Sequence, residues 1–351
     1  MNTALAPSSA RQAGVLLQGA PHSLLPPTAK VTGWGLAVPS GVLTNETIST
    51  MVDTSADWIV SRTGIHRRRI AADSESTSSL ATAAGLAALK RAGLSAADLD
   101  MVIVATSSPD SLVPATACRV QAALGAFGAS AFDVNTACTG FLYALTIASR
   151  FIETGSTKSV LVIGAECLSR LLDWDDRNTC VLFGDGAGAI VLQATSGTAG
   201  VQHSILGADG RGGDLIQIPL GSGRRPSTQS VIDGSHWIKV CGNEVFRWAS
   251  RIIVSAIRQL CLETGLALDE IDWIVPHQAN DRILHCAAKD LAIPLDRFVR
   301  NLADYGNTAA ASIPIALAEA AEGGRFLPGD RLVLVGFGGG LTWGAALLEW
   351  G

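Results

Sequence analysis

A nearly uncharged segment at residues 133–152 restricts the fold of this chain more than any other feature of its sequence. A short strand-like run ends near Val134, and small residues lead from it to Cys138. Apolar side chains then occupy every face of about three to four helical turns. Since such a helix must be covered on all sides in a soluble protein, we predict that it lies at the centre of a layered fold, with its first turn open to an interior cavity.

Cys138 falls at the first turn of this predicted helix. The unpaired N–H groups and the positive end of the helix dipole favour a thiolate over a thiol at such a position. This interpretation makes Cys138 a nucleophile. The alternative is a small buried cysteine without chemistry, which is the commoner role of a lone cysteine.

Length and composition favour an α/β protein of two units. The 351 residues suit two units of about 170 residues each. With 16% charged residues, 37 glycines and a mean hydropathy of +0.32, we expect much buried sheet and a covered subunit interface. The formal net charge of −5, without a basic run, argues against nucleic-acid binding. Every long apolar run is interrupted by Gly or polar residues, so no membrane insertion is expected.

The cysteines and the N-terminal segment bear on metal binding and location. The seven cysteines are scattered without a C-x-x-C pair, which argues against a disulfide framework or a zinc site, so no metal is expected. Residues 1–28 are rich in Ala, Ser and Pro and lack an apolar run long enough for a signal peptide. We interpret them as a mobile tail, with a transit-like segment as the alternative. The expected compartment is the cytoplasm.

Strand and helix patterns alternate through the first half of the chain. We predict one helix capped near residues 44–46 and two more helices at 74–93 and 115–124. We predict strands at 29–37, 100–106, 159–164 and 183–192.

Trp58 and Arg62 are four residues apart and share one face of a predicted helical turn. An indole beside a guanidinium can hold a planar, negatively charged ligand such as a nucleotide. The alternative is an ordinary surface tryptophan with a solvated arginine.

The second half of the chain repeats the first. Residues 99–100, before an apolar strand, recur as 271–272, and residues 162–164 recur as 334–336, both 172 positions later. The glycine-rich residues 183–186 recur as 337–340 at an offset of 154. Because the order of these matches is the same in both halves, internal duplication into units 29–198 and 199–351 is the simplest account.

The duplication predicts that three polar residues lie around one cavity. At an offset of about 170, the helix after Asn307 is the predicted counterpart of the helix at Cys138, which makes these two residues predicted pseudo-symmetry mates. His277 follows the predicted strand 271–276, at the sheet edge where α/β proteins place their chemistry. A His can activate a Cys nucleophile, and an Asn can donate a hydrogen bond to oxyanion or enolate charge.

The sequence around these positions closely resembles the condensing enzymes called β-ketoacyl-ACP synthase III. The matching motifs are residues 135–141, 275–280, 305–314, 183–189 and 336–344, and the resemblance covers about residues 30–351. It implies a thiolase-like fold of five αβαβα layers, built from two similar halves and assembled as a homodimer.

The resemblance also implies a role for each matching residue. Cys138 would accept the acyl group of an acyl-CoA, and His277 and Asn307 would serve the decarboxylation of malonyl-ACP. Further implied roles are oxyanion or decarboxylation support for Gly339 and Phe337, coenzyme A binding for Trp58, Arg62, Arg177 and Asn280, and acyl carrier protein binding for Arg282 and Lys289. Coenzyme A and the phosphopantetheine of the carrier are carried by substrates, so no cofactor is expected.

Other interpretations share part of this pattern. A papain-like cysteine peptidase has the same order of Cys, His and Asn, but its local cysteine signature is missing here. An acyltransferase of the same fold would omit decarboxylation, against which the intact Asn307 and Phe337 weigh. A catalytically silent scaffold would not need to retain all three reactive positions. For Arg282 and Lys289, which are interleaved with acidic residues, a solvated face is the alternative.

Val113 bears on the size of the acyl primer. In the family, the loop before a Pro-x-x-Ala-Cys turn reaches into the acyl pocket of the partner subunit, and some members carry a Phe there. The turn here is at residues 114–118, and Val113 takes the matching position. The resemblance therefore implies tolerance of primers longer or more branched than acetyl.

Overall fold

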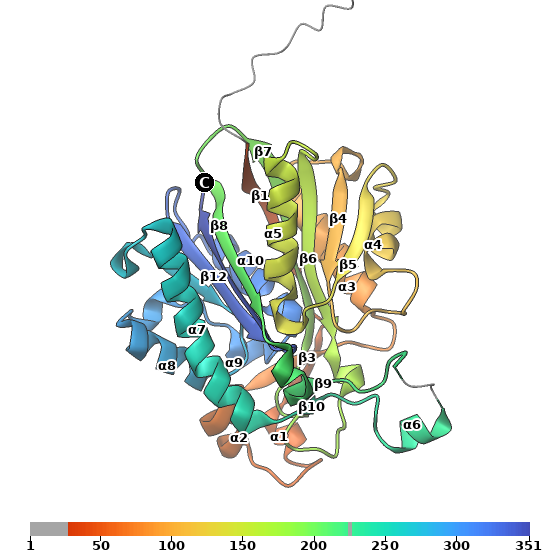
Figure 1. Cartoon of the computed structure of the whole chain (residues 1–351). Helices are drawn as coiled ribbons and strands as arrows, with labels where there is room; N and C mark the ends of the chain where they lie inside the picture. Colours follow the sequence, from red (N-terminus) through yellow and green to blue (C-terminus); the bar gives the residue numbers. More distant parts are fainter. Residues whose placement is uncertain (1–26, 224–226) are drawn as a thin grey trace, which may run out of the picture.

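The computed structural model describes residues 27–223 and 227–351, which contain two large β-sheets (Figure 1). The first sheet has the strand order β1-β7-β6-β4-β5. Strands β6, β4 and β5 run parallel, and β7 runs antiparallel to both β6 and β1. The strands are β1 (Thr28–Ala37), β4 (Met101–Ala105), β5 (Ser130–Val134), β6 (Ser159–Cys167) and β7 (Asp185–Thr195).

The second sheet repeats the arrangement of the first with the order β11-β12-β13-β8. Its strands are β8 (Gly200–Ala208), β11 (Trp273–Pro276), β12 (Arg331–Gly338) and β13 (Thr342–Glu349). The β11–β12 pair is parallel and the other two pairs are antiparallel. Met101 pairs with Val160 in the first sheet, and Trp273 pairs with Leu332 in the second. Both members of this pair are shifted by the predicted 172 residues, so the duplication is confirmed.

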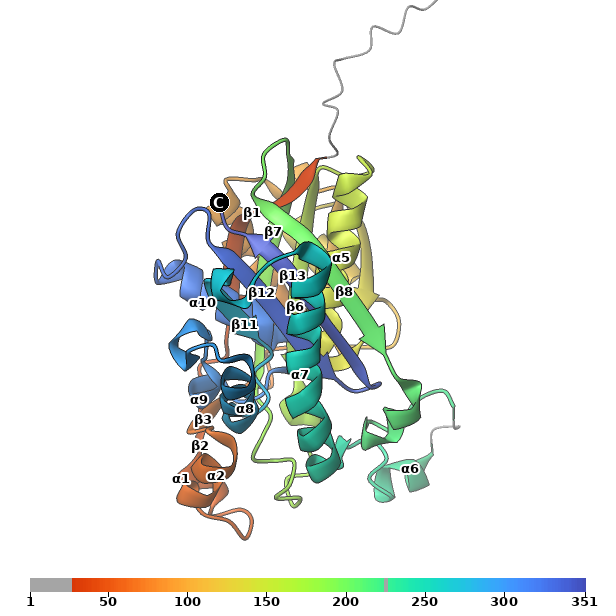
Figure 2. The same cartoon turned by 60° about the vertical axis from the view of Figure 1, so that its left-hand side comes forward.

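Helices separate and cover the two sheets, which makes five layers (Figures 1 and 2). The central layer consists of α5 (Gly140–Glu153) and α10 (Ser312–Glu322). The outer face of the first sheet is covered by α3 (Thr77–Ala92) and α4 (Thr116–Leu124), and that of the second by α7 (Gly242–Thr264) and α8 (Asp281–Leu291). The predicted αβαβα arrangement is therefore confirmed.

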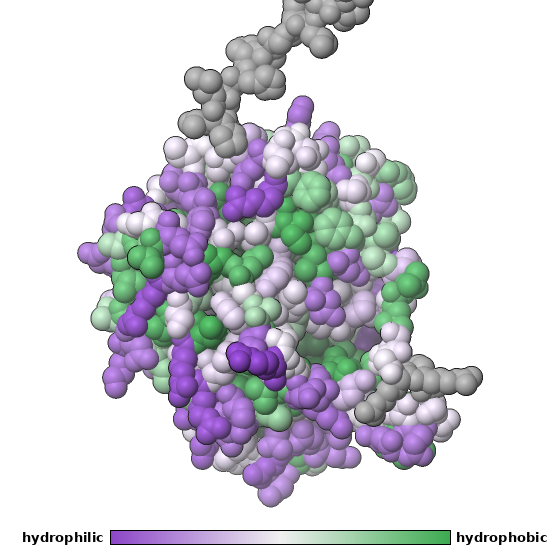
Figure 3. All heavy atoms as spheres, in the orientation of Figure 1, coloured by the Kyte–Doolittle hydropathy of each residue, from purple (hydrophilic) through white to green (hydrophobic). Residues whose placement is uncertain are grey.

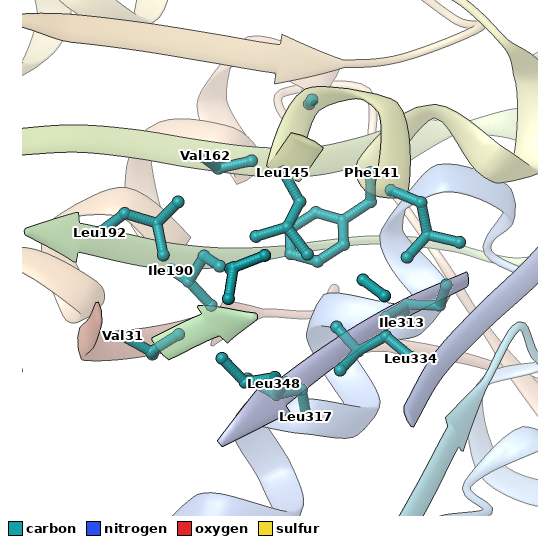
Figure 4. Close-up of a cluster of buried hydrophobic side chains, with 14 of the residues drawn as sticks. Val31, Phe141, Leu145, Val162, Ile190, Leu192, Ile313, Leu317, Leu334 and Leu348 are labelled. Atoms are coloured by element: carbon teal, nitrogen blue, oxygen red, sulfur yellow. The ribbon is translucent and has the colours of Figure 1, made fainter. Parts of the chain in front are cut away.

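The core of the central layer is a single cluster of aliphatic and aromatic side chains (Figure 4). Phe141 and Leu145 of α5 pack beside Ile313 of α10, between the facing sides of the two sheets. In the buried strand β4, alternate residues point to opposite faces, so Ile103 joins this central cluster while Val104 packs under α3 and α4. Burial on both faces explains the continuous apolar runs of these strands.

The prediction that the helix after Cys138 is buried on every side is wrong. One side of α5 faces solvent, where Arg150 is exposed and Phe151 is 39% exposed. The helix with the more complete cover is α10, in which every residue from Ser312 to Ala318 is buried. The sheets cover α5 from two directions, so an apolar composition alone did not establish cover on its remaining side.

The glycine-rich match between residues 183–186 and 337–340 is also not a structural correspondence. Phe337 lies inside β12, the counterpart of β6, whereas Asp185 begins β7. Gly164 pairs with Gly188, and Gly336 pairs with Gly344, so the true counterpart of Gly188 is Gly344. The similarity reflects a shared need for small residues, because a Cβ at Gly188 would lie 2.4 Å from the backbone N of Ile315 in α10.

Smaller elements complete the chain. The antiparallel pair of β2 (Gly41–Thr44) and β3 (Arg67–Ile70) lies with α1 (Asn45–Ile48), α2 (Ala56–Thr63) and α9 (Leu302–Tyr305) at the lower left in Figure 2. Between β8 and α7 the chain forms β9 (Ile216–Gln217), α6 (Thr228–Ile232) and β10 (Lys239–Val240).

The helix predicted at 74–93 is three residues shorter at its start, because the Ser76 hydroxyl caps it by accepting the Ser79 N–H. Residues 1–26 of the predicted tail lie outside the described residues. Within residues 27–223 and 227–351, no helix is long and apolar enough to cross a membrane.

Candidate active site

Cys138 lies in a 3-10 turn, Ala137–Thr139, that connects β5 to α5. It therefore precedes α5 and does not belong to its first turn. The side chain is 9% exposed and packs in a cluster with Leu168, Leu172, Phe183, Ile238 and Ala309. A Cβ at Gly338 would lie 2.8 Å from the backbone N of Cys138, so only glycine lets the end of β12 approach the turn this closely.

The Cys138 turn has a structural copy before α10. Ala137 and Ala309, 172 residues apart, both adopt left-handed conformations, with φ angles of 48° and 41°. Asn135 Oδ1 accepts the Ala137 N–H at 3.3 Å, and Asn307 Oδ1 accepts the Ala309 N–H at 2.9 Å. The mate of Asn307 is thus Asn135, and the predicted pairing of Asn307 with Cys138 is wrong. The approximate offset missed the Asn-Thr-Ala repeat that sets the register.

Asn307 is held rigidly by its backbone and by its side chain. Its N–H donates to the Leu182 carbonyl at 2.9 Å, and its own carbonyl accepts the Gly184 N–H at 3.0 Å. Because Ala309 N–H occupies the side-chain oxygen, the Nδ2 amide is left as a hydrogen-bond donor. Asn307 is buried, and the adjacent Ala309 packs in the cluster around Cys138.

His277 follows β11 directly, as predicted, and its N–H donates to the Val335 carbonyl at 2.8 Å. The ring is buried and meets the Phe337 ring edge to face, with centroids 5.3 Å apart and planes at 73°. Burial lowers the pKa of His277 to about 3, because the cationic form loses its hydration. The imidazole is therefore neutral at neutral pH.

The three residues converge through shared neighbours. Phe337, which contacts His277, directly precedes Gly338, which touches Cys138. The turn after Asn307, Ala309–Ala311, contacts the Cys138 turn. The structure thus brings together the Cys, His and Asn that the sequence predicted.

The Cys138 thiol is protonated at rest. Burial raises its pKa to about 12, and the nearby Glu166 carboxylate adds to this effect. The predicted resting thiolate is therefore wrong, because the loss of hydration outweighs the helix dipole. The thiol proton has to leave as a thioester is attacked.

Glu166 is a buried carboxyl that the sequence did not single out. Its oxygens accept the Ser107 N–H at 3.0 and 3.1 Å and the Ser108 hydroxyl. Burial raises its pKa to about 7 despite these hydrogen bonds. Glu166 therefore ties the segment after β4 to the end of β6, next to Cys138.

Thr139 and Thr342 form a second link that the sequence did not reveal. Their hydroxyl oxygens are 2.7 Å apart in the interior. Thr342 Oγ1 also lies 2.9 Å from the Gly339 carbonyl oxygen, and Thr139 Oγ1 donates to the Thr136 carbonyl at 2.7 Å. The Cys138 turn is thereby fastened to the glycine-rich connection between β12 and β13. The two residues are 203 positions apart, so no local pattern signals the contact.

The predicted coenzyme A residues are arranged around α2. The Arg177 guanidinium lies 5.4 Å from the Trp58 ring centroid and stacks over it, so Arg177 and not Arg62 is the stacking partner of Trp58. Arg62 is exposed on the last turn of α2. Asn280 Nδ2 donates to the Arg62 carbonyl at 3.0 Å, and Asn280 Oδ1 caps α8.

Three further predicted residues lie on the surface. Arg282 and Lys289 are exposed on α8, where Arg282 also stacks over Phe246 of α7 at 5.1 Å. Val113 is 85% exposed in the segment between β4 and α4. Among the residues that the structure describes, no group of three His, Cys, Asp or Glu side chains is arranged to hold a metal ion.

Two stacked, duplicated sheets around α5, which follows Cys138, and α10, which follows Asn307, define a class, the thiolase-fold condensing enzymes. The family description 3-oxoacyl-[acyl-carrier-protein] synthase III matches residues 132–210, and that of its C-terminal part matches residues 261–350. The chain is 49% identical over 323 residues to the β-ketoacyl-[acyl-carrier-protein] synthase III of Roseiflexus castenholzii, which covers 92% of this chain and 98% of that protein.

Solved structures agree with this relationship. The 3-oxoacyl-[acyl-carrier-protein] synthase III of Aquifex aeolicus has 43% identity and a TM-score of 0.86, over 92% of this chain and 100% of that one. The priming β-ketosynthase of the R1128 polyketide pathway has 33% identity and a TM-score of 0.87, over 93% and 97%. The chain belongs to the β-ketoacyl-ACP synthase III family. The predicted fold and enzyme class are confirmed, and the fold offers no support for a cysteine peptidase.

Proposed function

We propose that the chain transfers an acyl group from acyl-CoA to Cys138 and condenses it with malonyl-ACP, with loss of carbon dioxide, to give a β-ketoacyl-ACP. One observation supports the assignment of these steps to particular residues. A buried thiol lies close, through shared neighbours, to a neutral imidazole and to a carboxamide whose Nδ2 is left as a donor. Transfer without decarboxylation is the less favoured alternative, because these two polar groups would then have no step to serve.

Acyl loading requires only the thiol and a polarised thioester. The Cys138 sulfur attacks the acyl-CoA carbonyl, the bond from that carbon to the coenzyme A sulfur breaks, and coenzyme A leaves with the thiol proton. The N–H groups of Cys138 and Gly339 are the proposed donors to the oxyanion. The approach of Gly338 to within contact of Cys138 supports this role, since it places the following residue beside the same turn.

Condensation uses the other two residues. The bond between the malonyl carboxylate and C2 breaks, and its electron pair forms an enolate on the thioester, to which His277 and Asn307 Nδ2 donate hydrogen bonds. C2 then attacks the acyl carbonyl, and Cys138 leaves and regains a proton. Phe337, packed against the imidazole, places an apolar surface where the carboxylate loses its charge.

Coenzyme A is proposed to bind at the α2 end. The stacked Trp58 and Arg177 side chains offer an aromatic and a cationic plane that could separate to take an adenine ring between them. Arg62, exposed on the same helix, supplies positive charge for phosphates. Asn280, which already joins α2 to α8, is the proposed pantetheine contact.

The acyl carrier protein is proposed to dock on α8 through Arg282 and Lys289. Seven residues, about two helical turns, separate these exposed cations, so they share one face. Acidic carrier proteins are attracted by such a cationic face.

We also propose a homodimer that forms at the β5 edge of the first sheet. Among the described residues, strand β5 has a neighbour on one side only, and apolar residues gather over α5 and the adjoining sheet in Figure 3. Exposed Phe151 on α5 and Val113 near α4 belong to the apolar residues that a partner subunit would cover. In this dimer Val113 would line the partner's acyl pocket. A cytoplasmic location remains a prediction.

Intact-mass measurement tests the proposed loading step. The protein is incubated with acetyl-, isobutyryl- and octanoyl-CoA in turn, and its mass is compared with that of Cys138→Ala. We expect one acyl addition on the native chain and none on the variant. Equal labelling of Cys138→Ala would refute the assignment of the nucleophile, and the pattern across the three thioesters identifies the primer class.

A further inference from the structure

The most informative unassigned contact joins His277 to Ser312. The Nδ1 atom of the imidazole lies 2.6 Å from Ser312 Oγ at the first residue of α10. Both side chains are 1% exposed. Among the described residues of the site, Ser312 hydrogen-bonds to His277 and not to Cys138 or Asn307, and the proposed reaction gives it no step of its own.

The internal duplication shows that this pair occupies a special position in the fold. Counting back 172 residues, His277 corresponds to Ala105 and Ser312 to Gly140. A Cβ at Gly140 would lie 3.1 Å from the Ala105 Cβ, so the first half has the same contact without polar groups. The strand end and the helix start meet in both halves, and only the second half carries an imidazole with a hydroxyl beneath it.

The donors and acceptors around the Ser312 hydroxyl determine the direction of its hydrogen bond to His277. In the part of the chain that the structure describes, the Ser312 hydroxyl contacts two groups, the His277 Nδ1 and the Gln278 backbone N–H at 3.4 Å. The Gln278 N–H can only donate, so it uses the serine oxygen as an acceptor. The serine proton then has one acceptor within reach, Nδ1, and a buried hydroxyl proton without an acceptor is costly.

We propose that Ser312 is a positioning residue that holds His277 in the tautomer with its proton on Nε2. This inference rests on the proposed role of His277 and deepens it. A neutral imidazole that accepts at Nδ1 carries its single proton on Nε2, and Nε2 is therefore a donor. A donor suits a thioester oxygen that becomes an enolate. The same tautomer cannot take the Cys138 proton, so acyl loading does not use His277 as a base.

Nitrogen-15 NMR of histidine-labelled native protein tests the tautomer directly. The His277 signals are assigned by their loss in His277→Asn, and long-range couplings to the ring carbons show which nitrogen bears the proton. We expect the proton on Nε2. A proton on Nδ1 in the native protein overturns the proposal, whatever the activity of any variant.

Kinetics of Ser312→Ala test the consequence for the reaction. We expect decarboxylation of malonyl-ACP to fall about 10-fold or more, while acyl transfer to Cys138 stays within about threefold, because only the former needs the Nε2 donor. Ser149→Ala is the matched control, since Ser149 is a buried serine of the other central helix whose hydroxyl donates to the Thr146 carbonyl. It should leave both steps unchanged.

The outcomes separate this inference from the proposed function. Equal losses of both steps in Ser312→Ala, or no loss in either, overturn the role of Ser312. If His277→Asn retains normal decarboxylation, the proposed role of His277 fails instead, while the tautomer from NMR stands on its own.

Discussion

Glu166 makes the electrostatics of the site depend on pH at the level of a single residue. Burial raises the pKa of its carboxyl from the ordinary 4.5 to about 7, so the folded chain binds a proton more tightly than the unfolded chain. Between these two pH values the folded state holds more protons. Stability therefore decreases as pH rises through this range, and the full penalty is present above it.

Substitution of Glu166 by Gln should remove this penalty. A shift from 4.5 to about 7 corresponds to about 3 kcal/mol of unfolding free energy. We expect the unfolding free energy of the native chain to fall by about that amount, relative to Glu166→Gln, between pH 4.5 and pH 7.5. Urea unfolding at several pH values measures this difference. Glu322→Gln, at a carboxylate with a side chain 64% exposed, is the control, and identical pH slopes for native and Glu166→Gln chains would contradict the prediction.

Sequence reasoning found the residues that stand in motifs and missed those that act through distant partners. Cys138 and His277 each follow a strand, and Asn307 precedes the turn that leads into α10, so local patterns place all three at the ends of regular elements. Ser312 and Glu166 gain their importance from contacts 35 and about 60 positions away in the chain. Hydration energies explain the other error, since a local dipole argument for a Cys138 thiolate cannot account for the cost of burying the charge.

At the scale of elements, the turn that carries Cys138 is positioned by the connection between β12 and β13. The Thr139 and Thr342 hydroxyls join the two segments. The Cys138 and Gly339 N–H groups, one on each segment, are the proposed oxyanion donors. Their mutual geometry therefore depends on this hydrogen bond.

Thr139→Val keeps the shape of the side chain and removes its hydroxyl. We expect the rate of acyl loading at saturation to fall about 5- to 30-fold, for a cost of about 1–2 kcal/mol, with KM for acyl-CoA nearly unchanged. Thr139→Ser retains the hydroxyl and should load at close to the native rate. Single-turnover loading assays measure both rates. Equal rates for the two variants would show that the Thr139 hydroxyl does not contribute to acyl loading.

The proposed coenzyme A site begins where α2 meets the segment before β7. Trp58→Ala and Arg177→Ala should each raise the apparent KM for acyl-CoA about 5- to 30-fold, because each removes one plane of the stacked pair. Decarboxylation of malonyl-ACP should be little changed. Arg211→Ala, at a guanidinium 91% exposed elsewhere on the surface, is the control. If both variants have the same KM for acyl-CoA as this control, Trp58 and Arg177 do not bind coenzyme A.

Helices and strands were predictable from the sequence where local signals define their bounds. Strand β4 and the helices α3 and α4 fall close to their predicted ranges, because apolar runs, capping residues and glycine stops are local signals. The exposed side of α5 was not predictable, since its apolar residues do not reveal whether a sheet, a helix or another subunit covers them. The register of the duplication also required the backbone, because Ala137 and Ala309 share a left-handed conformation that their residue type does not suggest.

At the scale of the whole molecule, apolar residues gather over α5 and the adjoining sheet on the face shown in Figure 3, and the proposed homodimer gives Val113 a function at the subunit interface. If Val113 lines the partner's acyl pocket, its small side chain leaves room for branched or longer primers. Val113→Phe should lower kcat/KM for isobutyryl- and octanoyl-CoA about 10-fold or more, while that for acetyl-CoA changes little. Leu327→Phe, at a residue 64% exposed elsewhere, is the control. A native enzyme confined to acetyl-CoA, with no change in Val113→Phe, refutes this role.

Acyl loading and condensation use different residues of the proposed site, and one mass measurement distinguishes the two roles. The double variant His277→Ala/Asn307→Ala is incubated with acetyl-CoA and then with malonyl-ACP, and its intact mass is followed beside that of the native chain. We predict that the double variant keeps one acetyl group on Cys138, because loading needs neither residue. The native chain should lose the acetyl group to β-ketoacyl-ACP. A double variant that never gains the acetyl group, or that releases it to malonyl-ACP at the native rate, would contradict the account.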